Sequence, residues 1–217
     1  MKDPSTRFLV IQSFLELKSK PGSTPKPPSI LEDFRERSLF TQLLQGLVRY
    51  DRLLEEEIKR RLLRNKKLQK SVSAILKLGI FELLFMEKIP ARASLHQAGW
   101  LAERFRVKAA KPMINGILRK LLEELDQGYD PKMTHSFEIY QSFPSWMLER
   151  WKTQYGEHQA LELCQFSNQF QGVHLLLCDN VVIINFSLII TINVTLGRLP
   201  CDDWKIAPHL HHSPNAP

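Results

Sequence analysis

The feature that most constrains the fold is an apolar spacing of three and four positions that recurs through the first 170 or so residues. One such run is Tyr50, Leu54, Ile58 and Leu62. This spacing places apolar side chains on one face of an α-helix, whereas a half-buried strand requires strict alternation. No alternating run of more than a few residues occurs before residue 172. The sequence therefore predicts an all-α bundle of about seven or eight helices.

Capping residues indicate where the first helices begin. Asp3-Pro4 predicts the start of the first helix, because aspartate caps a helix and proline fits its first turn. Ser29-Ile30-Leu31-Glu32 has the pattern of a capping box and predicts the start of the second. Residues 72–84 are apolar on almost every side, which predicts the central helix of the bundle, ended by Pro90.

Glycine and proline indicate the later helix boundaries. Pro112 predicts the start of a sixth helix, which Gly128 and Pro131 end. A loop is expected next, before Pro144 opens a short aromatic helix. Gly156 ends this helix, and a last helix is expected to end near residue 168.

Residues 172–217 differ in composition from the rest of the chain. They contain two basic and three acidic residues, against 28 and 20 in residues 1–171. The β-branched run Val181–Leu196 contains Asn185 and Asn193 and is shorter than the ~20 residues of a transmembrane helix. We therefore expect no membrane segment. A strand pair is one interpretation of this run, and a disordered, altered or frame-shifted terminus is the preferred one.

Basic residues are concentrated after the third apolar run. Seven of the twelve residues from Lys59 to Lys70 are basic, and the chain has a formal net charge of +7. Such cations complement a helix C-terminus, so a solvated basic face is one interpretation. The functional interpretation is contact with RNA phosphates, which gives affinity and not sequence reading. The predicted RNA-binding residues are Arg7, Lys59, Arg60, Arg61, Arg64, Lys66, Lys67, Arg92, Arg119 and Lys120.

The residues that could carry chemistry do not form a recognisable catalytic or metal site. His96 has no carboxylate within one turn, and Cys164 has apolar neighbours, which predicts a buried thiol. Cys201 and the histidines within 209–212 have no zinc-ligand spacing. The absence of any Gly-x-Gly excludes the usual nucleotide-binding loops. We therefore predict no catalytic residue, no bound cofactor and no metal in this chain.

Cysteine usage and the first residues bear on the cellular compartment. The three cysteines are odd in number and widely spaced, which does not indicate a disulfide framework. The first residues lack the apolar region of a signal peptide. A reducing, cytoplasmic compartment is expected.

Several segments resemble known families. Residues 75–85 with Ile89-Pro90-Ala91 resemble the central helix of the NusB family, and residues 40–58 resemble the helices before it. Met113-Ile114-Asn115-Gly116-Ile117-Leu118-Arg119 resembles the V-N-G-V-L-R helix start of that family. Residues 143–151 (FPSWMLERW) and 167–169 (SNQ) resemble the H-P-S-W-L-x-x-R-W and N-N-Q segments of the RsmB (Fmu/Sun) family. The latter are 16S ribosomal RNA cytosine-5 methyltransferases with a NusB-like N-terminal part.

This resemblance implies a domain organisation. Residues 1–135 are expected to form a NusB-like helical RNA-binding domain, and residues 136–171 the start of the methyltransferase linker or N-terminal subdomain. Residues 172–217 are expected to be an aberrant or disordered tail. Residues 94–99 (SLHQAG) depart from the A-x-N-E-A-V pattern of the family and lack its acidic residue.

The resemblance also implies a function. Beyond residue 170 the family continues with a domain that binds S-adenosylmethionine and carries P-C-x-G and T-C-S motifs, whereas this chain matches only the dipeptide Pro200-Cys201. The expected function is RNA binding, with ribosomal RNA as the expected partner. The chain would then be the truncated rRNA-targeting part of a 16S rRNA (cytosine-5) methyltransferase, inactive as it stands. One alternative is a transcription-antitermination module that binds a protein partner. Another is a fragment of an S-adenosylmethionine-dependent rRNA methyltransferase.

Overall fold

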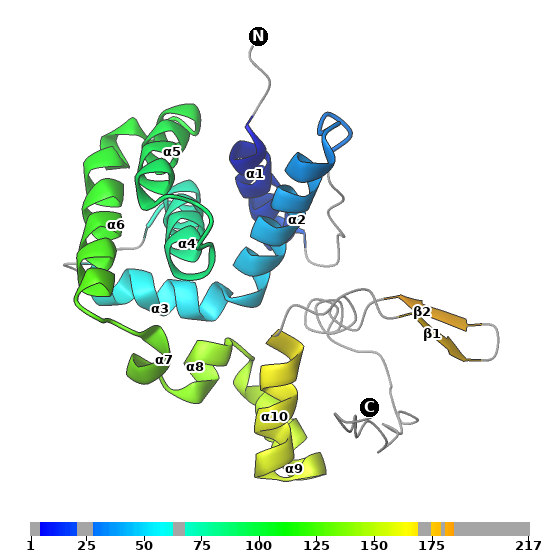
Figure 1. The fold of residues 1–217 in the computed structure, drawn as a ribbon. Coiled ribbons are helices and arrows are strands. Elements are labelled where there is room, and N and C mark those ends of the chain that lie inside the picture. The colour runs from blue at the N-terminus through cyan, green and yellow to red at the C-terminus, as the bar shows by residue number, and fades with distance from the viewer. Residues whose placement is uncertain (1–4, 21–27, 63–67, 169–174, 179–180, 185–217) are drawn as a thin grey trace, which may run out of the picture.

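The computed structural model describes residues 5–20, 28–62, 68–168, 175–178 and 181–184. Over these residues it is a helical bundle followed by one pair of strands (Figure 1). The helices are α1 (Thr6–Ser19), α2 (Phe34–Arg49), α3 (Asp51–Arg61), α4 (Lys70–Phe85), α5 (Ala91–Arg104), a 3₁₀ turn (Lys108–Ala110), α6 (Lys111–Asp126), α7 (Pro131–Thr134), α8 (Phe137–Gln141), α9 (Ser145–Tyr155) and α10 (Glu157–Asn168). The all-α prediction is confirmed.

α4 is the central helix, as its sequence predicts. Its buried side chains include Val72, Ile75, Leu76 and Ile80. The helix packs against α1, α2, α3, α5 and α6, so their apolar faces share one core around it (Figure 1). α3 runs beneath the bundle from α2 to the end of α6 (Figure 1).

The first two helices begin later than the capping patterns predict. Ser5 caps α1 by accepting a hydrogen bond from the backbone N–H of Phe8, and Asp3-Pro4 lies outside the described residues. Asp33 caps α2 by accepting from the N–H of Arg35, so the prediction of a helix start at Ser29–Glu32 is wrong. The physical reason is local: a turn closed by the N–H of Leu31 and the carbonyl of Pro28 precedes the helix, and Asp33 supplies a carboxylate acceptor after it.

The segment expected as a loop after α6 contains two short helices. Asp130 caps α7 and Pro131 occupies its first turn, so this proline starts a helix as well as following one. α8 follows directly and ends at Ser142, whose backbone is left-handed with a φ of 62°. α7 and α8 account for the difference between the expected seven or eight helices and the ten α-helices of the described residues.

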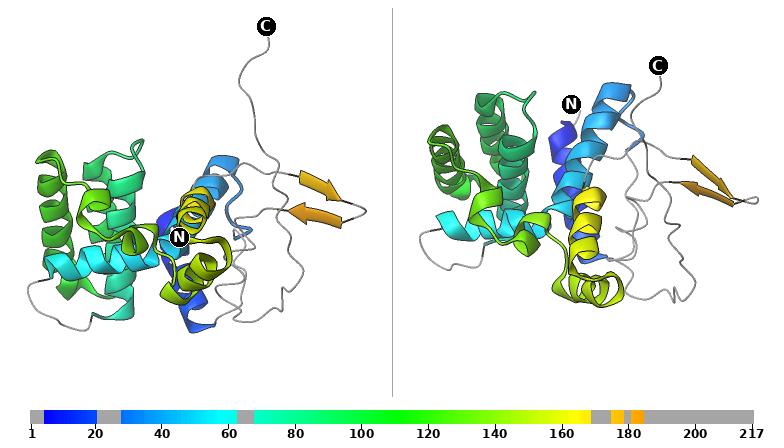
Figure 2. Two further views of the ribbon diagram at one scale, coloured as in Figure 1. Left: turned by 90° about the horizontal axis from the view of Figure 1, so that it is seen from below. Right: turned by 60° about the horizontal axis from the view of Figure 1, so that its bottom comes forward.

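α9 and α10 form an antiparallel pair with an apolar cluster of its own. Phe143, Met147, Leu148, Ala160 and Cys164 are buried in this cluster. The cysteine is a free, buried thiol, as predicted. Both views of Figure 2 place the pair near the corner between α2 and α3 and away from α5 and α6.

The strand pair follows α10 in the chain. β1 (Leu175–Cys178) and β2 (Val181–Ile184) pair antiparallel, with Leu175 opposite Ile184. β2 covers the first four residues of the β-branched run, and the rest of that run lies outside the described residues. No helix of the described residues is both long and apolar enough to cross a membrane.

Candidate nucleic-acid interface

The C-terminal turn of α3 presents three consecutive cations, and each lies in a different environment. Arg61 is in the interior, and its side chain has 0% exposure. Its guanidinium bridges Glu57, four residues earlier on α3, and Glu124 on α6, at 2.5 Å from each carboxylate. Arg61 was predicted as a phosphate contact, but the structure places it in a buried ion pair that joins two helices.

Glu57 organises the polar cluster around this arginine. Its carboxylate is completely buried, accepts a 2.6 Å hydrogen bond from the hydroxyl of Tyr129 and contacts the Nε2 atom of His135. Burial by itself would raise the pKa of Glu57, but the hydrogen bonds from Tyr129, His135 and Arg61 lower it overall. The cluster therefore attaches the segment after α6 to the underside of α3.

Arg60 is exposed, unlike its neighbour. Its guanidinium carbon lies 4.3 Å from the centroid of the Tyr129 ring, over the face of the ring. Sequence reasoning did not predict a role for Tyr129, because no helical spacing links residues so far apart in the chain. The tyrosine holds the arginine side chain in place through a cation–π contact.

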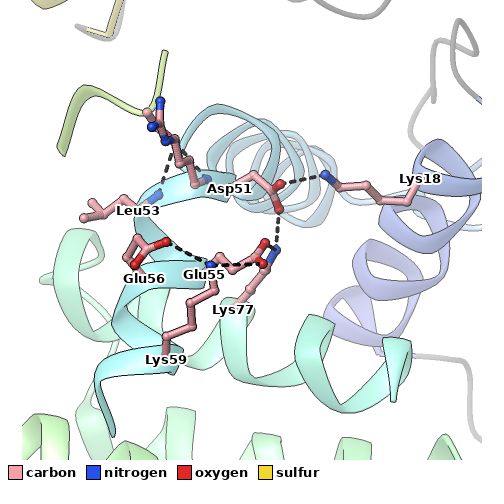
Figure 3. Close-up of polar contacts among 9 residues, drawn as sticks. Lys18, Asp51, Leu53, Glu55, Glu56, Lys59 and Lys77 are labelled. Atoms are coloured by element: carbon pink, nitrogen blue, oxygen red, sulfur yellow. Dashed lines mark hydrogen bonds and ion pairs between the residues drawn. The ribbon is translucent and has the colours of Figure 1, made fainter. Parts of the chain in front are cut away.

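Lys59 is exposed and lies beside two carboxylates of its own helix. Its ammonium nitrogen is 3.0 Å from Glu56 and 3.7 Å from Glu55 (Figure 3). The hydrogen bond to Glu56 is the main cause that raises the pKa of Lys59. The two acidic residues offset the charge that this lysine would offer to an RNA phosphate.

Arg7 lies in a different part of the bundle. Its Nε donates to the buried carboxylate of Glu82 at 2.6 Å, which joins α1 to α4. Arg7 was predicted to bind RNA, but in the structure it forms a largely buried ion pair with Glu82. Arg64, Lys66 and Lys67 were also predicted and lie outside the described residues.

Three predicted cations are exposed on α5 and α6. Arg92 is in the first turn of α5, and Arg119 and Lys120 are on α6. α5 and α6 pack side by side, with Gly99 next to Lys111, so the start of α5 lies beside the second half of α6. Among the described residues, none of these three cations forms an ion pair with a carboxylate.

The Arg61–Glu124 ion pair brings this group near the end of α3. It holds the last turn of α3 against the last turns of α6, where the two helices meet in Figure 1. The end of α3, which carries the exposed Arg60, therefore lies next to the second half of α6, which carries Arg119 and Lys120. We define the basic surface as Arg60, Arg92, Arg119 and Lys120.

The described residues provide little else for chemistry. No group of three or more His, Cys, Asp or Glu side chains in the described part of the chain could hold a metal ion. Burial raises the pKa of the Cys164 thiol to about 11. His96 is exposed on α5, in line with its interpretation as a surface residue. Cys201 and residues 209–212 are outside the described residues.

Comparisons with known proteins identify the family of the helical bundle. A model of the NusB family matches residues 12–123. The probable ribosomal RNA small subunit methyltransferase B of Bacillus subtilis is 26% identical over 174 residues, which cover 76% of this chain and 38% of that protein. The protein of the same name from Synechocystis sp. is 29% identical over 146 residues, 64% of this chain and 32% of that protein.

A second group of relatives consists of shorter proteins. The transcription antitermination protein NusB of Bacillus subtilis is 31% identical over 100 residues, which cover 45% of this chain and 76% of that protein. The chain thus spans about a third of the length of the methyltransferases and matches most of the length of NusB. Since the family model matches just over half of the chain and α1 to α6 pack around one central helix, the chain belongs to the NusB family.

Proposed function

We propose that this chain binds ribosomal RNA through its NusB-like domain and performs the targeting step of a 16S rRNA (cytosine-5) methyltransferase. The observation that carries the proposal is the extent of the similarity. An alignment that covers 76% of this chain must continue past residue 123, where the family match ends, and into α9. The antitermination proteins match only 45% of the chain or less.

The basic surface is the proposed contact with the RNA backbone. Its four cations are exposed and form no ion pair with a carboxylate of the described ranges, so their charge is available to phosphates. Cations that neutralise phosphates release condensed counterions, which supplies affinity that falls with salt. Arg61 supports the surface indirectly, by joining α3, which carries Arg60, to α6, which carries Arg119 and Lys120.

We infer that this chain carries RNA binding and not methyl transfer. Transfer to a pyrimidine ring requires a thiolate nucleophile and a bound methyl donor. Cys164 is buried and its pKa of about 11 keeps it protonated near neutral pH. The whole sequence has no Gly-x-Gly loop for such a donor. No cofactor is therefore assigned to the chain.

Binding of a protein partner, as in antitermination, is a second candidate function. It is supported by the match to most of the length of NusB. A stable heterodimer that shows no affinity for RNA would favour this function over the first.

The test is binding of the full chain to a 16S rRNA fragment by filter retention at low salt. Arg119→Glu and Lys120→Glu together should weaken retention roughly tenfold and reduce the slope of log K against log salt by about two. Arg150→Glu is the control, because Arg150 is an exposed cation on α9, a helix that lies away from α5 and α6 (Figure 2). Equal retention by all variants would contradict the proposal.

A further inference from the structure

Arg60 differs from the other exposed cations of the basic surface in having an aromatic support. One side of its guanidinium lies over the Tyr129 ring, with the carbon 4.3 Å from the ring centroid. The residue itself is exposed at the end of α3. A planar cation that is held on one side and exposed to solvent offers its other side to a second flat group.

The ring beneath Arg60 is fixed from below. The Tyr129 hydroxyl donates a 2.6 Å hydrogen bond to Glu57, which is completely buried. The guanidinium of Arg61 lies 5.1 Å from the same ring centroid and is itself bridged between Glu57 and Glu124. These contacts hold the tyrosine in one orientation before any ligand binds, which lowers the entropy lost on binding.

We propose that Arg60 and Tyr129 form a stacking site for one unpaired nucleobase of the bound RNA. Proteins bind splayed, single-stranded bases by stacking them on aromatic rings or on arginine guanidinium planes, whereas bases inside a duplex are not accessible to such a site. Arg119 and Lys120 are exposed on α6, the helix that Arg61 joins to the end of α3, and we expect them to contact phosphates of the same RNA. The site rests on the proposed RNA-binding function and adds to it a requirement for an unpaired base.

Charge and stacking at Arg60 are separated by Arg60→Lys. Lysine keeps the positive charge but has no planar group, so it can contact phosphates and cannot stack a base. Arg119→Lys is the matched control, because Arg119 is an exposed arginine that lies over no aromatic ring of the described residues. Tyr129→Phe keeps the ring and removes the hydroxyl that donates to Glu57. Circular dichroism checks that each of the three variants folds.

The probes are oligoadenylate and the abasic ribose-phosphate backbone of the same length, measured by competition against a labelled oligoadenylate. For oligoadenylate, Arg60→Lys should weaken binding roughly fivefold or more, as expected for loss of one stacked base. For the abasic backbone, Arg60→Lys should have no effect. Arg119→Lys should leave binding of both probes unchanged, and Tyr129→Phe should retain the preference for the probe with bases.

The outcomes separate the two proposals. If both probes bind and Arg60→Lys changes neither affinity, the stacking site is disproved and RNA binding through phosphates remains. If neither probe nor the 16S rRNA fragment binds the wild-type chain, the proposed function fails, and the stacking site with it. An equal loss for both probes in Arg60→Lys would also overturn the stacking site, because it would assign the effect to the backbone.

Discussion

Ser142 lies against the first turn of α3, where its hydroxyl oxygen accepts a 2.9 Å hydrogen bond from the backbone N–H of Arg52. The N–H of Leu53 donates to the same oxygen at 3.3 Å. No side chain near the start of α3 caps this helix, so a residue from beyond α8 performs the role. The contact ties the α8–α10 segment to the NusB-like bundle.

Replacing Ser142 should therefore destabilise α3 from a distance. Ser142→Ala is expected to lower the free energy of unfolding by about 1 kcal/mol, the usual effect of losing a side-chain cap. Urea unfolding followed by circular dichroism measures the change. Ser38→Ala, at an exposed position of α2, is the control and should change stability by less than about 0.5 kcal/mol. Equal stability of the two variants would contradict the capping role.

The buried Glu57 makes stability depend on pH. Because its pKa is lower in the folded protein than in the unfolded chain, the ionised carboxylate stabilises the fold above the unfolded pKa. This contribution is lost as the pH falls through the lowered, folded pKa. Glu57→Gln should be less stable than wild type near neutral pH, and the difference should shrink in acid. Urea titrations at several pH values measure it, and a difference that is constant across them would refute the assignment.

Asp51 offers a comparison between a buried and an exposed ion pair. Its carboxylate contacts the buried Lys77 at 2.7 Å and the exposed Lys18 at 2.6 Å (Figure 3). Lys77→Met should lower the free energy of unfolding by about 1–3 kcal/mol, since it leaves a partly buried carboxylate with one partner fewer. Lys18→Met should cost less than about 1 kcal/mol, because water screens the exposed pair. Thermal unfolding of both variants distinguishes them, and the reverse order would contradict the burial argument.

Two helical glycines should respond to alanine in opposite directions. A Cβ atom at Gly46 in α2 would lie 2.0 Å from the Cζ atom of Phe81, so Gly46→Ala should cost about 1–3 kcal/mol through overpacking. A Cβ atom at Gly116 in α6 meets nothing within 4 Å. Gly116→Ala should stabilise the protein by about 0.5–1 kcal/mol through helix propensity. A gain in stability at Gly46 would show that α2 and α4 approach each other less closely.

The helices themselves could be predicted from local sequence. Apolar spacing identified α3 to α6, and Pro144 and Gly156 bounded α9 correctly, because these signals act within one or two turns of the chain. The start of α2 could not be predicted in this way. Both Ser29 and Asp33 are residue types that cap helices. The turn closed between Pro28 and Leu31 favours Asp33 as the cap.

The candidate site depended on contacts that no local pattern encodes. Arg60 and Arg61 are adjacent and chemically identical, yet one is exposed over Tyr129 and the other is buried between Glu57 and Glu124. One feature of the sequence indicates that Arg61 is paired. Glu57 lies four residues before it, and side chains at this spacing meet on a helix. Glu124 and Tyr129 could not be placed beside α3 without the packing of α6.

The sequence by itself determined that this protein is an all-α member of a known family with an excess of basic residues, because apolar periodicity and charge can be read from neighbouring residues. Only the tertiary structure decided which cations remain available for RNA. A charge is retained in the interior where packing brings a carboxylate to it, as Glu124 of α6 meets Arg61 and Glu82 of α4 meets Arg7. The four cations of the basic surface stay in water, where their charge is open to the proposed contact with phosphates.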